Sequence, residues 1–168
     1  MPPIDPPVLG QLYRLHAAAL RLYARQWGTG AEDLVQSAFV RLARQSPPPA
    51  KPLAWLYQVV RTEALATHRA AVRRRQREER AGSLEAWFDA ADDRLDAAVV
   101  ARSLAELPLE LREVIVARLW GGLAFDEIAG LVGCSLPTAH RRYQAGLAAL
   151  RERLQGPWTN TPPAAKTT

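Results

Sequence analysis

The spacing of apolar residues restricts the fold of this chain more than any other feature of its 168 residues. Apolar side chains recur at intervals of three and four, which places them on one face of a helix, whereas a strand would need them at alternate positions. The first such face consists of Leu9, Tyr13, His16, Leu20, Tyr23 and Trp27. Because no segment keeps the alternation of a strand, the sequence predicts an all-α fold.

Glycines and prolines divide this pattern into separate predicted helices. The first helix ends at residues 28–30, Gly-Thr-Gly. The second ends at the proline-rich residues 46–52, because proline cannot donate to a helix and disfavours a helical residue before it. Its apolar stripe consists of Leu34, Val35, Ala38, Phe39 and Leu42. A third helix begins near Leu53 and continues into the arginine-rich residues 71–80.

The charge of the chain changes sign near its middle. Residues 61–80 hold seven Arg and three Glu, whereas residues 83–96 hold five acidic residues and one Arg. With Gly82 and Ser83 at the boundary, this change favours a linker between two small helical domains over a solvated helix face. The predicted boundaries are a disordered N-terminus at 1–8, a first domain at 9–80, an acidic linker at 81–91, a second domain at 92–154 and a disordered tail at 155–168.

Composition narrows the class of protein further. The net charge of +5 is compatible with a polyanionic partner, although a basic surface also serves solubility. Cys134 is the only cysteine, so it forms no intramolecular disulfide, and we interpret it as a small buried apolar residue rather than a reactive thiol. The N-terminus lacks the features of a signal peptide, and no apolar run approaches the ~20 residues that span a bilayer. The sequence therefore predicts a cytoplasmic protein without membrane insertion.

Residues 124–154 contain two helical patterns separated by Gly133, Cys134 and Ser135. Gly133 suits the left-handed conformation that ends a helix, and Ser135 suits the N-cap of the next helix. The second helix is predicted to pack through Leu136, Ala139, Tyr143, Leu147 and Leu150 and to expose Thr138, Arg141, Arg142 and Ala145. This pattern is typical of a helix-turn-helix that reads the major groove, although a generic helical hairpin shares the glycine turn.

Three segments resemble one family. Residues 104–154, LAELPLELREV to GLAALRERL, resemble the C-terminal domain of bacterial RNA polymerase sigma factors of the extracytoplasmic-function (ECF) group, within the sigma-70 family. Residues 31–44, AEDLVQSAFVRLAR, resemble the helix with which this family binds core polymerase. Residues 54–75 resemble the segment that melts the promoter and reads its minus-ten element. The resemblance covers residues 9–154 and implies two small helical domains.

The resemblance implies three groups of functional residues. The helix that docks on the β′ clamp is matched by Asp33, Leu34, Gln36, Phe39 and Val40, of which Leu34 and Phe39 also suit a core. The minus-ten surface is matched by Trp55, Arg61, Thr62, Ala66, Arg69, Arg73 and Arg74, where Trp55 is alternatively a core residue. The minus-thirty-five element is matched by Thr138, His140, Arg141, Arg142 and Gln144. Strand separation requires planar groups that hold the unstacked bases. It also requires cations that contact the phosphates of the displaced strand.

Several positions depart from the pattern of the family. Thr62 and Ala66 stand where the family usually has Asn and Asp, which leaves the base preference at the minus-ten element open. Ala124 stands where a Ser or Thr usually forms a capping box with the residue matching Glu127. The helix that follows is therefore expected to be less stable by ~1 kcal/mol.

The implied function is promoter recognition by a non-catalytic subunit. Such a factor binds core RNA polymerase at the β′ clamp and the β flap, brings it to promoter DNA and assists melting, and an anti-sigma factor is a candidate partner by analogy. A helix-turn-helix regulator that never engages polymerase is the alternative, but it leaves residues 31–44 unexplained. An enzyme is disfavoured because three widely spaced His, one Cys and carboxylates mainly on polar faces form no catalytic or metal-binding cluster, and no cofactor is expected.

Overall fold

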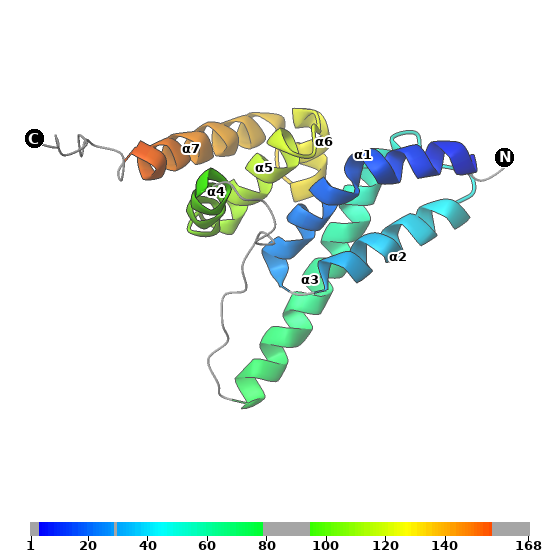
Figure 1. Ribbon diagram of the computed structural model, residues 1–168, viewed down its shortest axis with the longest axis horizontal. Helices are drawn as coiled ribbons and strands as arrows, with labels where there is room; N and C mark the ends of the chain where they lie inside the picture. The colour runs from blue at the N-terminus through cyan, green and yellow to red at the C-terminus, as the bar shows by residue number, and fades with distance from the viewer. Residues whose placement is uncertain (1–3, 29, 79–94, 156–168) are drawn as a thin grey trace, which may run out of the picture.

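The computed structural model describes residues 4–28, 30–78 and 95–155, and all regular elements within these ranges are helices (Figure 1). The first domain consists of α1 (Pro6–Ala24), the short 3₁₀ helix η1 (Arg25–Trp27), α2 (Ala31–Arg44) and α3 (Pro52–Glu78). The second domain consists of α4 (Leu95–Ala105), α5 (Leu109–Leu119), α6 (Phe125–Val132) and α7 (Leu136–Gln155). The all-α prediction is confirmed. The predicted acidic linker and nearly all of the predicted tail lie outside the described residues.

The first helix begins earlier than its apolar pattern predicts. It starts at Pro6, within the segment predicted to be disordered, because prolines in a first turn have the helical φ and need no hydrogen-bond partner for their nitrogen. Its predicted end is correct: η1 closes at Trp27, and Gly28 follows with a φ of 133°. The positive φ explains why a glycine ends this segment.

The three long helices of the first domain pack around a core of fully buried side chains. Figure 1 shows α2 alongside both α1 and the upper part of the long helix α3. Tyr23 lies at the centre of this core, edge-on to Trp27 at 5.1 Å and to Tyr57 at 4.9 Å between ring centroids. Its other buried members include Leu20, Val35, Leu42, Leu56 and Val60. The lower half of α3 extends beyond this core.

The turn between α6 and α7 has the predicted geometry of a helix-turn-helix. Gly133 adopts the left-handed conformation with φ 70° and ψ 42°, and the Cys134 amide donates to the carbonyl of Ala129 at 3.0 Å. Ser135 caps α7, since its Oγ accepts a hydrogen bond from the Thr138 amide at 3.3 Å. Local residue chemistry therefore fixes this turn.

The packed face of α7 differs from the predicted one. Ala139 and Leu150 are buried as expected, but Leu136 is 45% exposed. Gly146 is buried instead, and a Cβ at this position would lie 2.5 Å from Cδ1 of Ile115 in α5. Helix α7 is thus rotated about its axis so that Gly146 approaches α5. A pattern of apolar residues does not predict this contact.

The two domains are in direct contact. Helix α5 packs against α1, and α6 packs against α3. A single cluster of buried side chains includes Tyr57 from the first domain and Val114, Leu123 and Ile128 from the second. The charge boundary in the sequence predicted two domains, and the structure adds that their cores are continuous.

Candidate protein and nucleic-acid interfaces

Helix α2 presents one polar face on the side opposite its core. Asp33, Gln36 and Val40 are three and four residues apart, so they share a face, and all three are exposed. The Gln36 side chain donates to Glu32 Oε1 at 3.1 Å. Leu34 is half-buried and packs against the core, and Phe39 is 6% exposed. The structure therefore divides the five matched residues into three available for contact and two that support the fold.

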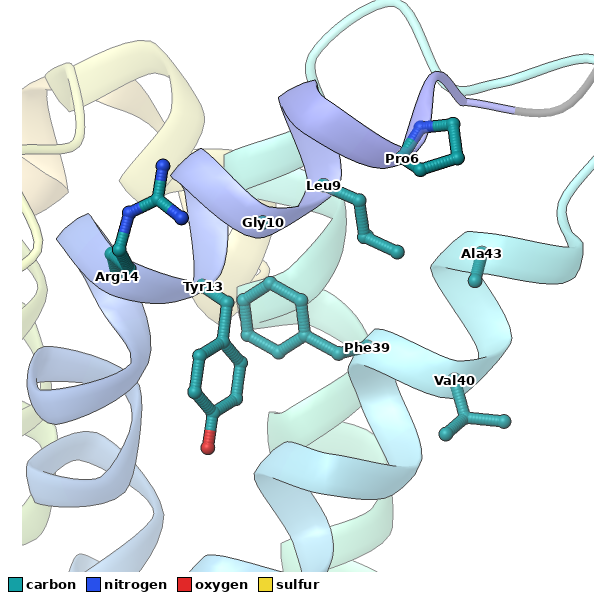
Figure 2. A pocket seen from close by; sticks show the side chains of 8 residues that line it. All are labelled: Pro6, Leu9, Gly10, Tyr13, Arg14, Phe39, Val40 and Ala43. Carbon is teal, nitrogen blue, oxygen red and sulfur yellow. The ribbon is translucent and has the colours of Figure 1, made fainter.

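An apolar hollow of about 460 Å³ adjoins this face, between α1 and α2 (Figure 2). It is lined by Pro6, Leu9, Gly10, Tyr13, Arg14, Phe39, Val40 and Ala43. The ring of Tyr13 stands edge-on to Phe39, with centroids 5.0 Å apart. The apolar spacing of Leu9 and Tyr13 predicts only packing, so the contribution of α1 to this hollow was not predicted; in the structure Tyr13 is 38% exposed.

A second surface follows α3 along its length. Five of the seven residues matched to the minus-ten surface are separated by seven, four, three and four positions, a spacing that keeps them on one face for ~27 Å. They are Trp55, Thr62, Ala66, Arg69 and Arg73. All are exposed except Trp55, which is half-buried and packs against the core. We call these five residues the α3 stripe; Arg74 is exposed beside it.

Arg61 lies off the α3 stripe and points toward the second domain. Its Nε donates to Oε1 of Glu113 in α5 at 2.5 Å, and the hydroxyl of Tyr23 donates to the same oxygen at 2.5 Å. Glu113 is only 4% exposed. The matched minus-ten residue Arg61 is thus held by a buried carboxylate of the other domain.

The electrostatics of this cluster agree with its geometry. Burial, and then the charge of Glu113, raise the pKa of the Tyr23 phenol well above its ordinary value. Burial by itself lowers the pKa of Arg61, but the hydrogen bond and charge of Glu113 outweigh it, so the net shift is upward. Arg61 therefore stays charged and Tyr23 stays neutral at physiological pH.

The first turns of α7 hold a chain of hydrogen bonds on the solvent side. The hydroxyls of Ser135 and Thr138 are 2.9 Å apart, and Arg141 Nη2 donates to Thr138 Oγ1 at 3.0 Å. Arg141 and Gln144 are exposed. The N-terminal part of this helix thus presents an oriented guanidinium to solvent, the group that reads guanine edges in the major groove.

Arg142 and His140 are held in other ways. Arg142 is partly buried, with its Nη2 3.6 Å from Glu110 of α5, because the turn of α7 brings it beside the packed face rather than opposite it. This corrects the prediction that Arg141 and Arg142 share the outward face. The ring of His140 stacks on Phe125 with centroids 3.9 Å apart, at the edge of the exposed face.

Glu113 was not among the predicted functional residues, because the carboxylates were assigned mainly to polar helix faces. A usable signal was present, since Glu113 precedes Val116 and Ala117 by three and four positions and therefore falls on their side of α5. Both of those residues are fully buried. A charged residue on such a face needs a partner, and the partners here come from the first domain.

The described part of the chain has neither a metal-binding cluster nor a membrane-spanning helix. It contains no group of three or more His, Cys, Asp or Glu placed to hold a metal ion. None of its helices is long and apolar enough to cross a membrane.

Two segments of the chain match described families. Residues 11–78 match Sigma-70 region 2, and residues 98–150 match Sigma-70, region 4. The fold is similar to that of the sigma factor RpoE from Bartonella quintana in complex with the anti-sigma factor NepR, with a TM-score of 0.72, 24% identity, and coverage of 88% of this chain and 96% of that chain. It is also similar to CnrH in complex with the cytosolic domain of CnrY, with a TM-score of 0.60, 27% identity and coverage of 90% of each chain. None of the curated protein sequences matches the chain.

Proposed function

Because the chain belongs to the ECF group of the sigma-70 family, whose members are non-catalytic subunits that direct RNA polymerase to promoters, we propose that it performs this function through three separate surfaces. These are the exposed face of α2 for core polymerase, the α3 stripe for the minus-ten element and the exposed face of α7 for the minus-thirty-five element. The proposal includes a cytoplasmic location, where polymerase and promoters are found.

One observation carries these assignments: each matched set has members on a helix face directed away from the core. The exposed members of the α3 stripe and the outward residues of α7 contribute little to packing, so their charges are available to a ligand. The stripe combines Trp55 with two arginines, which suits unstacked bases and strand phosphates.

Within the recognition helix, we assign base reading to Arg141 rather than Arg142. Arg141 is exposed and oriented by Thr138, whereas Arg142 is partly buried beside Glu110. A guanidinium that is already oriented loses less entropy when it makes a bidentate contact with guanine. Arg142 is assigned to phosphate contact at the edge of the groove.

The α2 face and the adjoining hollow are assigned to the β′ clamp of polymerase, and the second domain to the β flap. Asp33 and Gln36 supply polar contacts, while Val40, at 49% exposure, connects them to the apolar hollow. An anti-sigma factor is proposed as a further partner, since the solved structure of RpoE contains one and that of CnrH contains the cytosolic domain of CnrY.

Run-off transcription tests the function directly. Purified core polymerase is incubated with a promoter library in the presence and absence of the chain, and the transcripts are sequenced. The expected result is a promoter-specific gain in transcripts that share upstream elements. No gain, together with sequence-specific binding of the chain alone to DNA, would instead support a helix-turn-helix regulator that does not engage polymerase.

The docking assignment has its own test. The double variant Asp33→Ala and Gln36→Ala is expected to weaken binding to core polymerase while helical content stays nearly unchanged, because exposed polar residues contribute little to folding. Ser37→Ala, an exposed position in the same helix, is a matched control for loss of polar surface. Unaltered core affinity with intact circular dichroism would remove α2 from the docking surface.

A further inference from the structure

Leu136, the first residue of α7, lies outside both clusters of buried side chains. Its side chain is 45% exposed, although the apolar pattern of the helix predicts that it packs. We infer that Leu136 contacts the C5-methyl group of a thymine in the minus-thirty-five element and so adds a base preference that the polar residues of α7 do not supply. The inference rests on the proposed assignment of α7 to that element and names a further residue that determines its specificity.

The first line of argument is the place of Leu136 on the helix. Residues at the N-terminal end of a recognition helix meet the base edges when the helix lies in the major groove. Leu136 precedes His140 by four positions, so the two side chains share one side of α7, and His140 is exposed. Side chains of a helix lean toward its N-terminus, so Leu136 covers the end of α7 that enters the groove first.

The second line of argument is the surroundings of Leu136, which suit nucleic acid better than a protein partner. Residues 136–150 contain three side chains that carry or can gain a positive charge, His140, Arg141 and Arg142, and no acidic residue. Within this stretch, all of which the structure describes, Leu136 is the only exposed large apolar side chain. Protein partners bind contiguous apolar patches of larger area. A single leucine among cations is suited to an apolar group on a polyanion.

The third line of argument is the chemistry of the base edges. In the major groove, thymine is the base that presents an apolar group, its C5-methyl. Leucine neither donates nor accepts a hydrogen bond, so its contact with the other edges would remove water from polar groups without replacing their hydrogen bonds. Leu136 precedes Arg141 by five residues, or ~7.5 Å along the helix axis. At ~3.4 Å per base pair, the thymine is expected about two base pairs from the guanine that Arg141 reads.

Local contacts hold Leu136 in place before DNA binds. The Oγ of Ser135 accepts a hydrogen bond from the Thr138 amide at 3.3 Å, and its carbonyl accepts one from the Ala139 amide at 2.9 Å. Pro137 follows directly, and its ring fixes the backbone φ. The backbone on both sides of Leu136 is therefore already ordered, so the contact with thymine loses little entropy.

Replacement of thymine by deoxyuridine tests the inference, because it removes only the C5-methyl group. Holoenzyme is assembled from the full chain and core polymerase, and a promoter selected from a randomised library is synthesised with each upstream thymine replaced in turn. Wild type is expected to lose affinity about fourfold at one thymine, the effect of one methyl-sized group. Leu136→Ala is expected to bind the unmodified promoter at least about fourfold more weakly and to show no further loss on replacement, since the two changes remove the same contact.

Two variants serve as controls. Leu136→Met retains an apolar side chain of similar size and should keep the sensitivity to the methyl group. Leu15→Ala truncates a leucine of α1 that is 64% exposed, and it should respond to deoxyuridine as wild type does. Circular dichroism establishes that each variant keeps its helices. If Leu136→Ala loses helical content, Leu136→Gln replaces it, because glutamine keeps the length of the side chain without an apolar end.

Sensitivity at one thymine that disappears in Leu136→Ala supports the inference. A promoter-specific wild-type holoenzyme that is insensitive at every thymine overturns it. Full wild-type sensitivity in Leu136→Ala also overturns it, and weaker binding of that variant to core polymerase would then show that Leu136 contacts polymerase. In these cases promoter recognition persists, so failure of the inference is distinct from failure of the proposed function. Absence of specific DNA binding by both the holoenzyme and the isolated chain would overturn both.

Discussion

The two domains hold the arginines that match DNA-contacting positions in different ways. Arg61 of the first domain is bound to Glu113, 52 positions away in the sequence and in the other domain. Arg141 of the second domain is bound to Thr138, three positions away in the same helix turn, and remains exposed. A match to a DNA-contacting position therefore indicates which residue has the right chemistry, but its surroundings determine whether the side chain is free to act.

The reading surface proposed for the second domain is therefore held by residues of its own helix, whereas Arg61 in the surface proposed for the first domain depends on a residue of the second domain. Helix α7 is capped by its own Ser135, and its Arg141 is oriented by Thr138 of the same helix. All of the α3 stripe except Trp55 is exposed in this structure, whereas Arg61 beside it is partly buried. Four changes test this contrast, beginning with the largest expected effect.

Ala139→Asp is expected to unfold the second domain while the first domain keeps its helices. Ala139 is fully buried on the packed face of α7, and an aspartate there would be a charge without a partner, at a cost of several kcal/mol. Hydrogen exchange resolved by segment is the measurement, with loss of protection expected in α5 to α7. Ala145→Asp, on the exposed face of the same helix, is the control. Full protection of α7 in the Ala139 variant would mean that the face of the helix is misassigned.

Arg141→Ala is expected to cost ~1 to 3 kcal/mol of binding at promoters where it contacts guanine, and to relax the preference at one or two base positions. Arg142→Ala is expected to weaken all sites by a smaller and similar factor. Binding of each variant to a library randomised in the upstream element separates the two effects. Relaxed preference in the Arg142 variant alone would reverse the assignment.

Arg69→Ala combined with Arg73→Ala is expected to weaken holoenzyme binding to every promoter alike. Each arginine that contacts a phosphate contributes about one unit to the slope of log affinity against log salt concentration. The slope of the double variant should therefore be shallower than that of wild type. Arg74→Ala, beside the α3 stripe, is expected to change the slope less. A change confined to certain promoter sequences would show that these arginines read bases instead.

Ala124→Ser is expected to have the smallest effect and to stabilise the second domain by ~1 kcal/mol. Half of a capping box is already present, because Glu127 Oε2 accepts a hydrogen bond from the Ala124 amide at 2.9 Å. The backbone of Ala124 is extended, as an N-cap requires, so a serine hydroxyl would add the missing acceptor. The measurement is the free energy of unfolding by urea; no gain would indicate that another contact already satisfies the helix end.

Much of the candidate site followed from the sequence because its determinants are local. Gly133 ends one helix and Ser135 begins the next within three residues, and both roles follow from backbone and side-chain chemistry that neighbouring residues decide. The exposed face of α2 follows in the same way from the spacing of Asp33, Gln36 and Val40.

The remaining features depend on contacts between distant residues. The rotation of α7 follows from the approach of Gly146 to Ile115, and a hydrophobic pattern gives a glycine no weight. Tyr13 forms a hollow with Phe39 only because α1 and α2 lie side by side. Both features are set by shape between helices rather than by the periodicity of one helix.

The sequence by itself determined the helices, the turn between α6 and α7 and the family, since hydrogen bonds within a helix, caps and motif spacing all act over a few residues. The tertiary structure alone decided which matched side chains are free. Glu113 meets Tyr23 across 90 positions of the chain and Arg61 across 52, and the contact exists because the folded domains exclude water from that carboxylate. Burial of a charge is a property of the assembled fold, and its partners can come from any part of the sequence.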